Sequence, residues 1–228
     1  MKIIDAHTHI DSVFDPWQPN VVGVVCCVTK ESEWASVANL CANDNRVYGA
    51  FGIHPWFIND IDDEFGKHLE SLLLSNPKYM VGEIGLDKYK PDMDKQIEIF
   101  IKQFDIAVNL KRNVFLHCVG AWDKMLHILK QYNQSFLPKI IVHGFNENDD
   151  ILRKLLKYEN VFFSVSKNYV YSENSCIEQI PNNRILIETD GKKDVLLKDV
   201  LNKIIDIKDN KNMSDIIYNN TLRMLNDE

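Results

Sequence analysis

Ile3-Ile4-Asp5-Ala6-His7-Thr8-His9 is a short strand-like stretch that ends in two histidines. In a β-strand alternate side chains point to the same face, so Asp5, His7 and His9 share one face. Two imidazoles at this spacing can reach one metal ion without bending the backbone. Taken alone, the pattern is equally compatible with two histidines on a half-exposed edge strand. Further ligands at other strand ends would favour the metal site.

Short β-branched runs alternate with helical patterns along the rest of the chain. Seven further strands are expected at residues 21–28, 47–54, 78–83, 113–117, 139–143, 161–165 and 184–190. Helical patterns occupy residues 31–43, 61–76, 92–111, 121–132, 147–158, 173–179, 194–206 and 213–226. Eight strands separated by helices predict an α/β fold, a TIM-type (β/α)8 barrel, as a single domain over residues 1–228.

A doubly wound open sheet is the alternative arrangement of the same alternation. That fold would place a glycine-rich phosphate loop directly after the first strand. In this chain the corresponding position holds His9, Ile10 and Asp11. The barrel is therefore favoured.

Composition and charge narrow the class of protein. The 228 residues are 45% hydrophobic, and no apolar run is long enough for a membrane span. There is no signal-peptide pattern, and five cysteines without a CxxC pair indicate a reduced, cytoplasmic protein. The net charge of -7 argues against a broad nucleic-acid surface but permits binding of a nucleic-acid end at a metal site. No protein partner is expected, because no partner-binding helix or exposed apolar patch is evident.

Histidines and carboxylates collect at the ends of the predicted strands. These side chains are His7, His9, His54, Glu83, His117, His143 and Asp190. In a barrel the C-terminal strand ends carry the active site. A single such histidine would be an ordinary satisfied core residue, but several in register predict a metal site, because buried polar groups need partners. Mixed nitrogen and oxygen donors without a cysteine cluster suit Zn²⁺, Mn²⁺, Fe²⁺ or Mg²⁺ with open positions for water.

The donors are numerous enough for two ions. One plausible division assigns His7, His9 and Asp190 to the first ion and His117 and His143 to the second, with Glu83 bridging both. Two ions about 3.5–4 Å apart would lower the pKa of a shared water and hold a phosphoryl or carbonyl oxygen against it. Glu83 is therefore a candidate catalytic carboxylate.

Several motifs occur together in the order of a known family. They are Asp5–His9 (DAHTH), Gly52–Pro55 (GIHP), Gly82–Asp87 (GEIGLD), His117, His143–Phe145 (HGF), Glu188–Asp190 (ETD) and Asn220–Leu222 (NTL). Together they resemble the TatD family of metal-dependent hydrolases, with GEIGLD as the most specific match. The resemblance extends from residue 5 to about residue 225.

The resemblance implies a two-metal hydrolase of the amidohydrolase-like superfamily, with Mg²⁺, Mn²⁺ or Zn²⁺ as cofactors. Its expected activity is that of a deoxyribonuclease on DNA ends, commonly a 3′–5′ exonuclease on single strands. The implied metal ligands are His7, His9, Glu83, His117, His143 and Asp190. Asp190 is also the implied general base on the attacking water. His54 is expected to face substrate or support the ligands, with a purely structural role as the alternative, and Asp5 is expected to orient an imidazole.

Other functions remain open at this point. The same two-metal water could hydrolyse D-aminoacyl-tRNA or a small lactone or amide. A metal-binding module whose catalysis has decayed is a further alternative, from a different class. The presence of the complete ligand set argues against that last hypothesis.

The chain departs from the family pattern at residues that are expected to contact the substrate. Strand five reads His117-Cys118-Val119 where many members have His-Ser-Arg, so an arginine expected to contact phosphate is missing. Strand eight continues Asp190-Gly191-Lys192 instead of Asp-x-Pro. Substitutes for the missing contacts are lysines at strand ends, Lys88, Lys167 and Lys192, and two tryptophans that could stack on bases, Trp56 and Trp122. The ordinary roles of solvated lysine and packing aromatic compete with this hypothesis.

Overall fold

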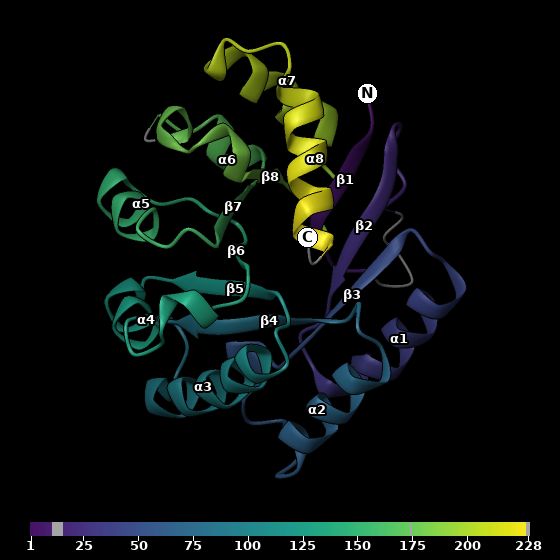
Figure 1. Cartoon of the computed structure of the whole chain (residues 1–228), viewed down its shortest axis with the longest axis vertical. Helices are drawn as coiled ribbons and strands as arrows, with labels where there is room; N and C mark the ends of the chain where they lie inside the picture. Colours follow the sequence, from purple (N-terminus) through teal and green to yellow (C-terminus); the bar gives the residue numbers. More distant parts are fainter. Residues whose placement is uncertain (11–15, 174, 227–228) are drawn as a thin grey trace. The chain divides into compact units, whose positions relative to one another are not determined.

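The computed structural model describes residues 1–10, 16–173 and 175–226 (Figure 1). Asp11 and residue 174 of the helix predicted at 173–179 lie outside the described residues. The strands follow one another in the sheet in sequence order. They are β1 (Ile3–Thr8), β2 (Val21–Cys27), β3 (Val47–Phe51), β4 (Met80–Asp87), β5 (Val114–Val119), β6 (Ile140–Val142), β7 (Val161–Val165) and β8 (Ile185–Ile187). This order confirms the predicted (β/α)8 class.

Helices follow most of the strands. They are α1 (Trp34–Asn43), α2 (Phe65–Ser75), α3 (Met93–Asn109), α4 (Trp122–Leu129), α5 (Asp149–Leu155), α6 (Lys167–Val170), α7 (Leu197–Lys208) and α8 (Met213–Leu225), with 3-10 turns η1 (Glu31–Glu33), η2 (Pro55–Phe57), η3 (Gln134–Phe136), η4 (Ile177–Gln179) and η5 (Asn182–Arg184). Helix α6 was not predicted from the sequence. In the described part of the segment predicted at 173–179, only the short turn η4 is helical.

Two strands end at other residues than predicted. The predicted third strand reaches His54, but β3 ends at Phe51 because Gln103 pairs with both backbone groups of Ile53. In the opposite direction, β4 continues to Asp87, since Leu86 and Asp87 still pair with β5.

The described residues group into two compact units. Unit 1 comprises Met1–Cys26 and Val142–Glu228, and unit 2 comprises Cys27–Ile141. The single domain over residues 1–228 stays a prediction.

Each unit contains buried apolar residues. In unit 2, α3 runs alongside β4 (Figure 1), and its buried residues Phe100 and Phe104 lie on one face of the helix. In unit 1, α8 packs against β8 and β1, and the aromatic rings of Phe145 and Phe163 meet edge to face. These contacts hold the strands that carry the polar side chains described below.

Gly85 in β4 is a position that only glycine fits. Its φ is 156°, and a Cβ there would lie 1.8 Å from the carbonyl oxygen of His117 in β5. The missing side chain therefore allows β5 to approach β4 beside His117.

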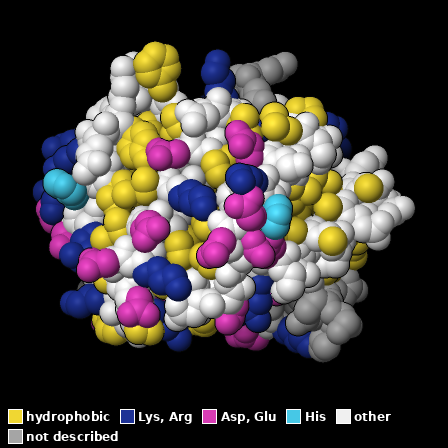
Figure 2. Space-filling model, turned by 90° about the horizontal axis from the view of Figure 1, so that it is seen from below, with side chains coloured by type: hydrophobic (Ala, Val, Ile, Leu, Met, Phe, Trp, Pro, Cys, Tyr) yellow, Lys and Arg dark blue, Asp and Glu magenta, His cyan; other side chains and the backbone are white. Residues whose placement is uncertain are grey.

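The surface carries charges of both signs. On the face shown in Figure 2, Lys and Arg side chains are interspersed with Asp and Glu side chains. Among the described residues, no helix combines the length and the hydrophobicity needed to cross a membrane.

Candidate metal centre

The first group of polar side chains, called the His7 cluster here, lies in unit 1 and consists of His7, His9, His143 and Asp190. His7 Nε2 lies 3.3 Å from His9 Nε2. The Oδ1 atom of Asp190 is 3.8 Å from His7 Nε2 and 3.6 Å from His9 Nε2. The ring of His143 stacks on that of His7 with 4.1 Å between centroids. Four of the predicted ligands are thus neighbours.

These separations fit the ligands of one divalent ion. Donors that each lie about 2.0–2.2 Å from a tetrahedral ion are about 3.3–3.6 Å apart. His7, His143 and Asp190 also each offer a donor atom within 4.8 Å of the others. The donor set, imidazole nitrogen with a carboxylate oxygen, suits Zn²⁺ or Mn²⁺.

Asp5 fixes the backbone beneath this cluster. Its buried carboxylate accepts hydrogen bonds from Thr189 Oγ1 at 2.6 Å and Thr189 N at 3.0 Å, and from the backbone N–H of His7 at 3.3 Å. Burial raises the pKa of Asp5 to about 7, although the hydrogen bonds from Thr189 oppose that shift. Asp5 therefore joins the end of β1 to the residues after β8, and it orients His7 through the main chain.

Asp190 turns into the cluster on an unusual backbone conformation. Its φ is 55°, in the left-handed region, and its N–H donates to the His7 carbonyl at 3.0 Å. Burial alone would raise the pKa of Asp190, but the hydrogen bond from His9 and the charges of His7 and His143 hold that pKa below its usual range. Lys192 Nζ lies 2.5 Å from the other carboxylate oxygen, Oδ2. The predicted phosphate-contacting role of Lys192 thus competes with an ion pair.

Glu188 supports His143, a role that the sequence analysis missed. The Glu188 carboxylate is fully buried, and its Oε1 accepts the N–H of Gly144 at 2.6 Å. The same oxygen lies 3.6 Å from His143 Nδ1. The signal available in the sequence was a carboxylate directly after a buried strand, which occurs rarely without a partner.

The second group, called the Glu83 cluster here, lies in unit 2 and consists of His54, Glu83 and His117. Glu83 Oε1 is 2.9 Å from His117 Nδ1 and 3.1 Å from His54 Nε2. All three residues are buried. Each of the three side chains offers a donor atom within 4.8 Å of the others. Asp87 Oδ2 lies 3.8 Å from His117 Nε2.

The hydrogen bonds of His54 define its tautomer. His54 caps the turn η2, and its Nδ1 accepts the backbone N–H of Trp56 at 3.1 Å. In the neutral imidazole the proton therefore sits on Nε2 and is donated to Glu83 Oε1. His54 in this state orients the carboxylate of Glu83 and has no lone pair left on Nε2 for a metal.

Two buried glutamines of α3 hold the loops that carry this cluster. Gln103 accepts the N–H of Ile53 at 2.7 Å and donates to its carbonyl at 3.1 Å. Gln96 accepts the N–H of Asp87 at 2.8 Å and donates to the carbonyls of Asp87 and Pro91 at 3.1 and 2.9 Å. Neither residue was predicted from the sequence. Their signal was two polar side chains on the buried stripe of an amphipathic helix.

The tryptophans and lysines predicted to contact substrate differ in their exposure and in their ion pairs. Trp122 is buried in α4, whereas Trp56 is 53% exposed beside the Glu83 cluster. Lys88 is exposed, and Lys167 is paired with Asp194 at 3.5 Å. Trp56 and Lys88 are therefore the candidates best placed to meet a ligand.

The ligand groups only partly follow the predicted division. The structure brings His143 to His7 and brings His54 to Glu83 and His117. The predicted pairing of His117 with His143 and the bridge by Glu83 combine residues of both units, and both stay predictions.

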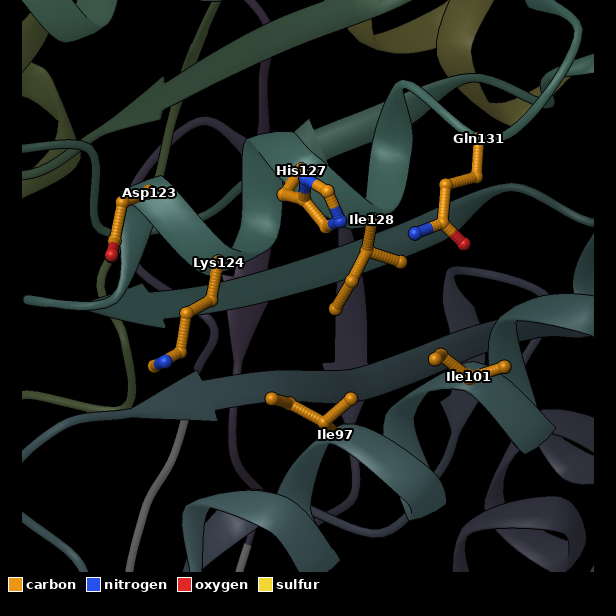
Figure 3. Close-up of a pocket in the computed structure, with 7 residues that line it drawn as sticks. All are labelled: Ile97, Ile101, Asp123, Lys124, His127, Ile128 and Gln131. Carbon is orange, nitrogen blue, oxygen red and sulfur yellow. The ribbon is translucent and has the colours of Figure 1, made fainter.

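A pocket of about 450 Å³ lies elsewhere, between α3 and α4 (Figure 3). Ile97 and Ile101 line one side, and the α4 residues Asp123, Lys124 and His127 line the other. None of the strand-end ligands lines it, so the metal chemistry is not located there.

Comparison with known proteins identifies the family of the chain. The profile of the family described as "TatD related DNase" matches residues 4–226. The human protein named "3'-5' RNA nuclease TATDN2" is 32% identical over 159 residues, which are 65% of this chain and 20% of that protein. The Escherichia coli protein named "Uncharacterized metal-dependent hydrolase YjjV" is 27% identical over 213 residues, which are 83% of this chain and 79% of that protein. The chain thus spans about a fifth of the length of the human relative.

A solved structure has the same fold. The crystal structure of the E. coli protein YjjV superposes with a TM-score of 0.84 at 24% identity and covers 98% of this chain and 97% of that chain. This likeness confirms the (β/α)8 fold.

Proposed function

This chain belongs to the TatD family of metal-dependent hydrolases, and we propose that it removes nucleotides from the 3′ ends of single-stranded DNA. The observation that carries the proposal is the His7 cluster, whose nitrogen and carboxylate donors have the mutual distances of ligands around one ion. The description of the family as a DNase supports DNA as the substrate, and the name of the human relative, a 3'-5' RNA nuclease, supports the direction of cleavage.

In this proposal the two clusters have different tasks. His7, His9, His143 and Asp190 are the proposed ligands of one ion, and Glu83 and His117 contribute ligands to another. His54 is a positioning residue that donates its Nε2 proton to Glu83 Oε1. Asp5 is a second positioning residue, since it fixes the backbone of His7 through its hydrogen bonds.

A bound divalent ion supplies Lewis-acid activation of water and of a phosphoryl oxygen. Asp190 accepts the proton of the attacking water on Oδ1, the oxygen that faces His7 and His9. Lys192 holds the opposite oxygen, Oδ2, and so fixes the orientation of the carboxylate. The buried imidazole of His7 and the stacked ring of His143 leave little freedom for the ligands to rearrange.

The test uses chelator-treated protein and single-stranded DNA labelled at its 5′ end. On addition of Mg²⁺, Mn²⁺ or Zn²⁺ we expect a ladder of products that shorten from the 3′ end. Asp190→Asn should lower the rate about 10²–10⁴-fold, the range typical of removing a general base. Asp63→Asn, the same change at an exposed loop residue, is the matched control and should leave the rate unchanged.

Two results would overturn the proposal. One is DNA that stays intact with every ion while the protein is folded and metal-loaded. The other is cleavage that Asp190→Asn leaves at the wild-type rate. If DNA stays intact and D-aminoacyl-tRNA is deacylated in the same preparation, the deacylase hypothesis replaces the nuclease.

A further inference from the structure

Trp56 is a large exposed aromatic side chain beside a buried polar cluster. It is 53% exposed, and its ring centroid lies 5.2 Å from that of His54 and 6.5 Å from that of His117. Leaving an indole in water forgoes the hydrophobic free energy that burial would supply. An exposed tryptophan at this place is therefore a candidate contact for a ligand of the Glu83 cluster.

The indole is held in one orientation without any ligand. Its Nε1–H donates to Asp87 Oδ2 at 2.6 Å, and its backbone N–H donates to His54 Nδ1 at 3.1 Å. Asp87 is itself buried, and Gln96 pairs with both of its backbone groups. Because the ring is already ordered, binding on its face costs little conformational entropy.

The segment after β4 adds a second aromatic ring and two cations. Tyr89 is 78% exposed, and its N–H donates to the other oxygen of Asp87, Oδ1, at 2.9 Å. Lys90 Nζ lies 4.2 Å from the centroid of the Trp56 ring. Lys88 precedes Tyr89, and within residues 1–10, 16–173 and 175–226 neither lysine is paired with a carboxylate. The indole of Trp56 and the backbone of Tyr89 thus both bind the buried carboxylate of Asp87, and the Lys90 ammonium lies over the indole.

We propose that Trp56, Tyr89, Lys88 and Lys90, called the Trp56 platform here, bind an unpaired nucleobase and its phosphate next to the Glu83 cluster. The inference rests on the proposed function, because it names the part of the substrate that this side of the molecule recognises. Aromatic faces stack on bases of any sequence, and lysines neutralise the adjacent phosphates. The family pattern has an arginine in strand five that would contact phosphate, and β5 lacks it. Lys88 and Lys90 would supply that phosphate contact instead.

The geometry favours a single strand over a duplex. A stacked base would lie about 3.5–4.0 Å from the indole plane, and only an unpaired base offers its whole face. The ammonium of Lys90 covers part of the indole. On binding, the base displaces the ammonium from the ring, and the ammonium then meets the phosphate.

The test measures binding in the presence of chelator, so that no DNA is cleaved. The probes are a fluorescent single-stranded oligonucleotide and the same oligonucleotide with abasic sites at its last three positions. Trp56→Leu should bind the normal strand about ten- to hundredfold more weakly, as expected for losing one stacked base, and the abasic strand as wild type does. Phe136→Leu is the matched control, because Phe136 is 69% exposed in η3, outside the platform, and should change neither affinity.

Two more variants keep the test valid if Trp56→Leu folds poorly. Tyr89 is so exposed that Tyr89→Leu should fold normally, and it should selectively weaken binding of the normal strand. Lys90→Gln should weaken both strands and lower the slope of log affinity against log salt by about 1.

The outcomes separate the platform from the proposed function. If wild-type protein trims DNA but Trp56→Leu and Tyr89→Leu bind both strands as wild type does, the platform is wrong and the nuclease stands. If the variants lose binding of the normal strand alone while no metal ion supports cleavage, the platform stands and the proposed function is wrong.

Discussion

Gln103→Leu should destabilise the protein well beyond the loss of one surface contact. Gln103 is fully buried, and it satisfies both the N–H and the carbonyl of Ile53, which is also buried. Leucine has a similar size but leaves both groups without a partner, at about 1–3 kcal/mol each. The more apolar side chain offsets part of this cost. We therefore expect the free energy of unfolding to fall by about 2–4 kcal/mol.

The assay is urea unfolding of the chelator-treated protein. We expect a lower midpoint urea concentration and an unchanged slope of the unfolding free energy against urea concentration. For a chain of this length the loss corresponds to about 4–16 °C in the melting temperature. Gln131→Leu is the matched control, since Gln131 is exposed near the end of α4 and its replacement should change stability by no more than about 0.5 kcal/mol. If Gln103→Leu were as stable as Gln131→Leu, the reasoning that Gln103 holds the loop before His54 would be refuted.

Three other experiments test the hydrogen bond to Asp5, the packing of Gly85 and metal binding by the His7 cluster. Thr189→Val removes the hydroxyl that donates to Asp5 Oδ2 at 2.6 Å, so urea unfolding should show a loss of about 1–3 kcal/mol; an unchanged midpoint would contradict this. Gly85→Ala places a Cβ 1.8 Å from the His117 carbonyl oxygen, so we expect little soluble protein, and a well-folded variant by circular dichroism would count against the packing described. Zn²⁺ or Mn²⁺ at about a thousand times its dissociation constant should stabilise wild type by about 4 kcal/mol in thermal melts. The effect should shrink in Asp190→Asn, and equal stabilisation of both proteins would argue against the His7 cluster as ligands.

Much of the architecture follows from local patterns in the sequence. The apolar run Val21–Cys27 locates β2, and the histidines near the C-terminal ends of β1, β5 and β6 locate the functional ends of those strands. Both patterns are short-range properties of the sequence. Strand limits were less accurate. β3 stops early because its hydrogen bonds go to Gln103, a partner fifty residues later that no local pattern reveals.

The roles of the site residues were harder to predict from the sequence than their positions. His54 follows β3 and His117 lies within β5. The Nδ1 atom of His54 accepts a hydrogen bond from Trp56, and this commits its other nitrogen to Glu83. Glu188 and the two glutamines of α3 act through side-chain contacts between distant segments. Such contacts depend on tertiary packing, which spacing along the chain does not encode.

Elemental analysis of the metal-loaded protein tests the account most directly. After saturation with Zn²⁺ or Mn²⁺ and removal of excess ion, wild type should retain about two ions per chain, the stoichiometry of a two-metal hydrolase. His7→Asn and His117→Asn should each lose about one of them and lose cleavage of single-stranded DNA. A folded wild-type protein that retains no ion at saturation, or that hydrolyses DNA equally well without one, would contradict the central claim.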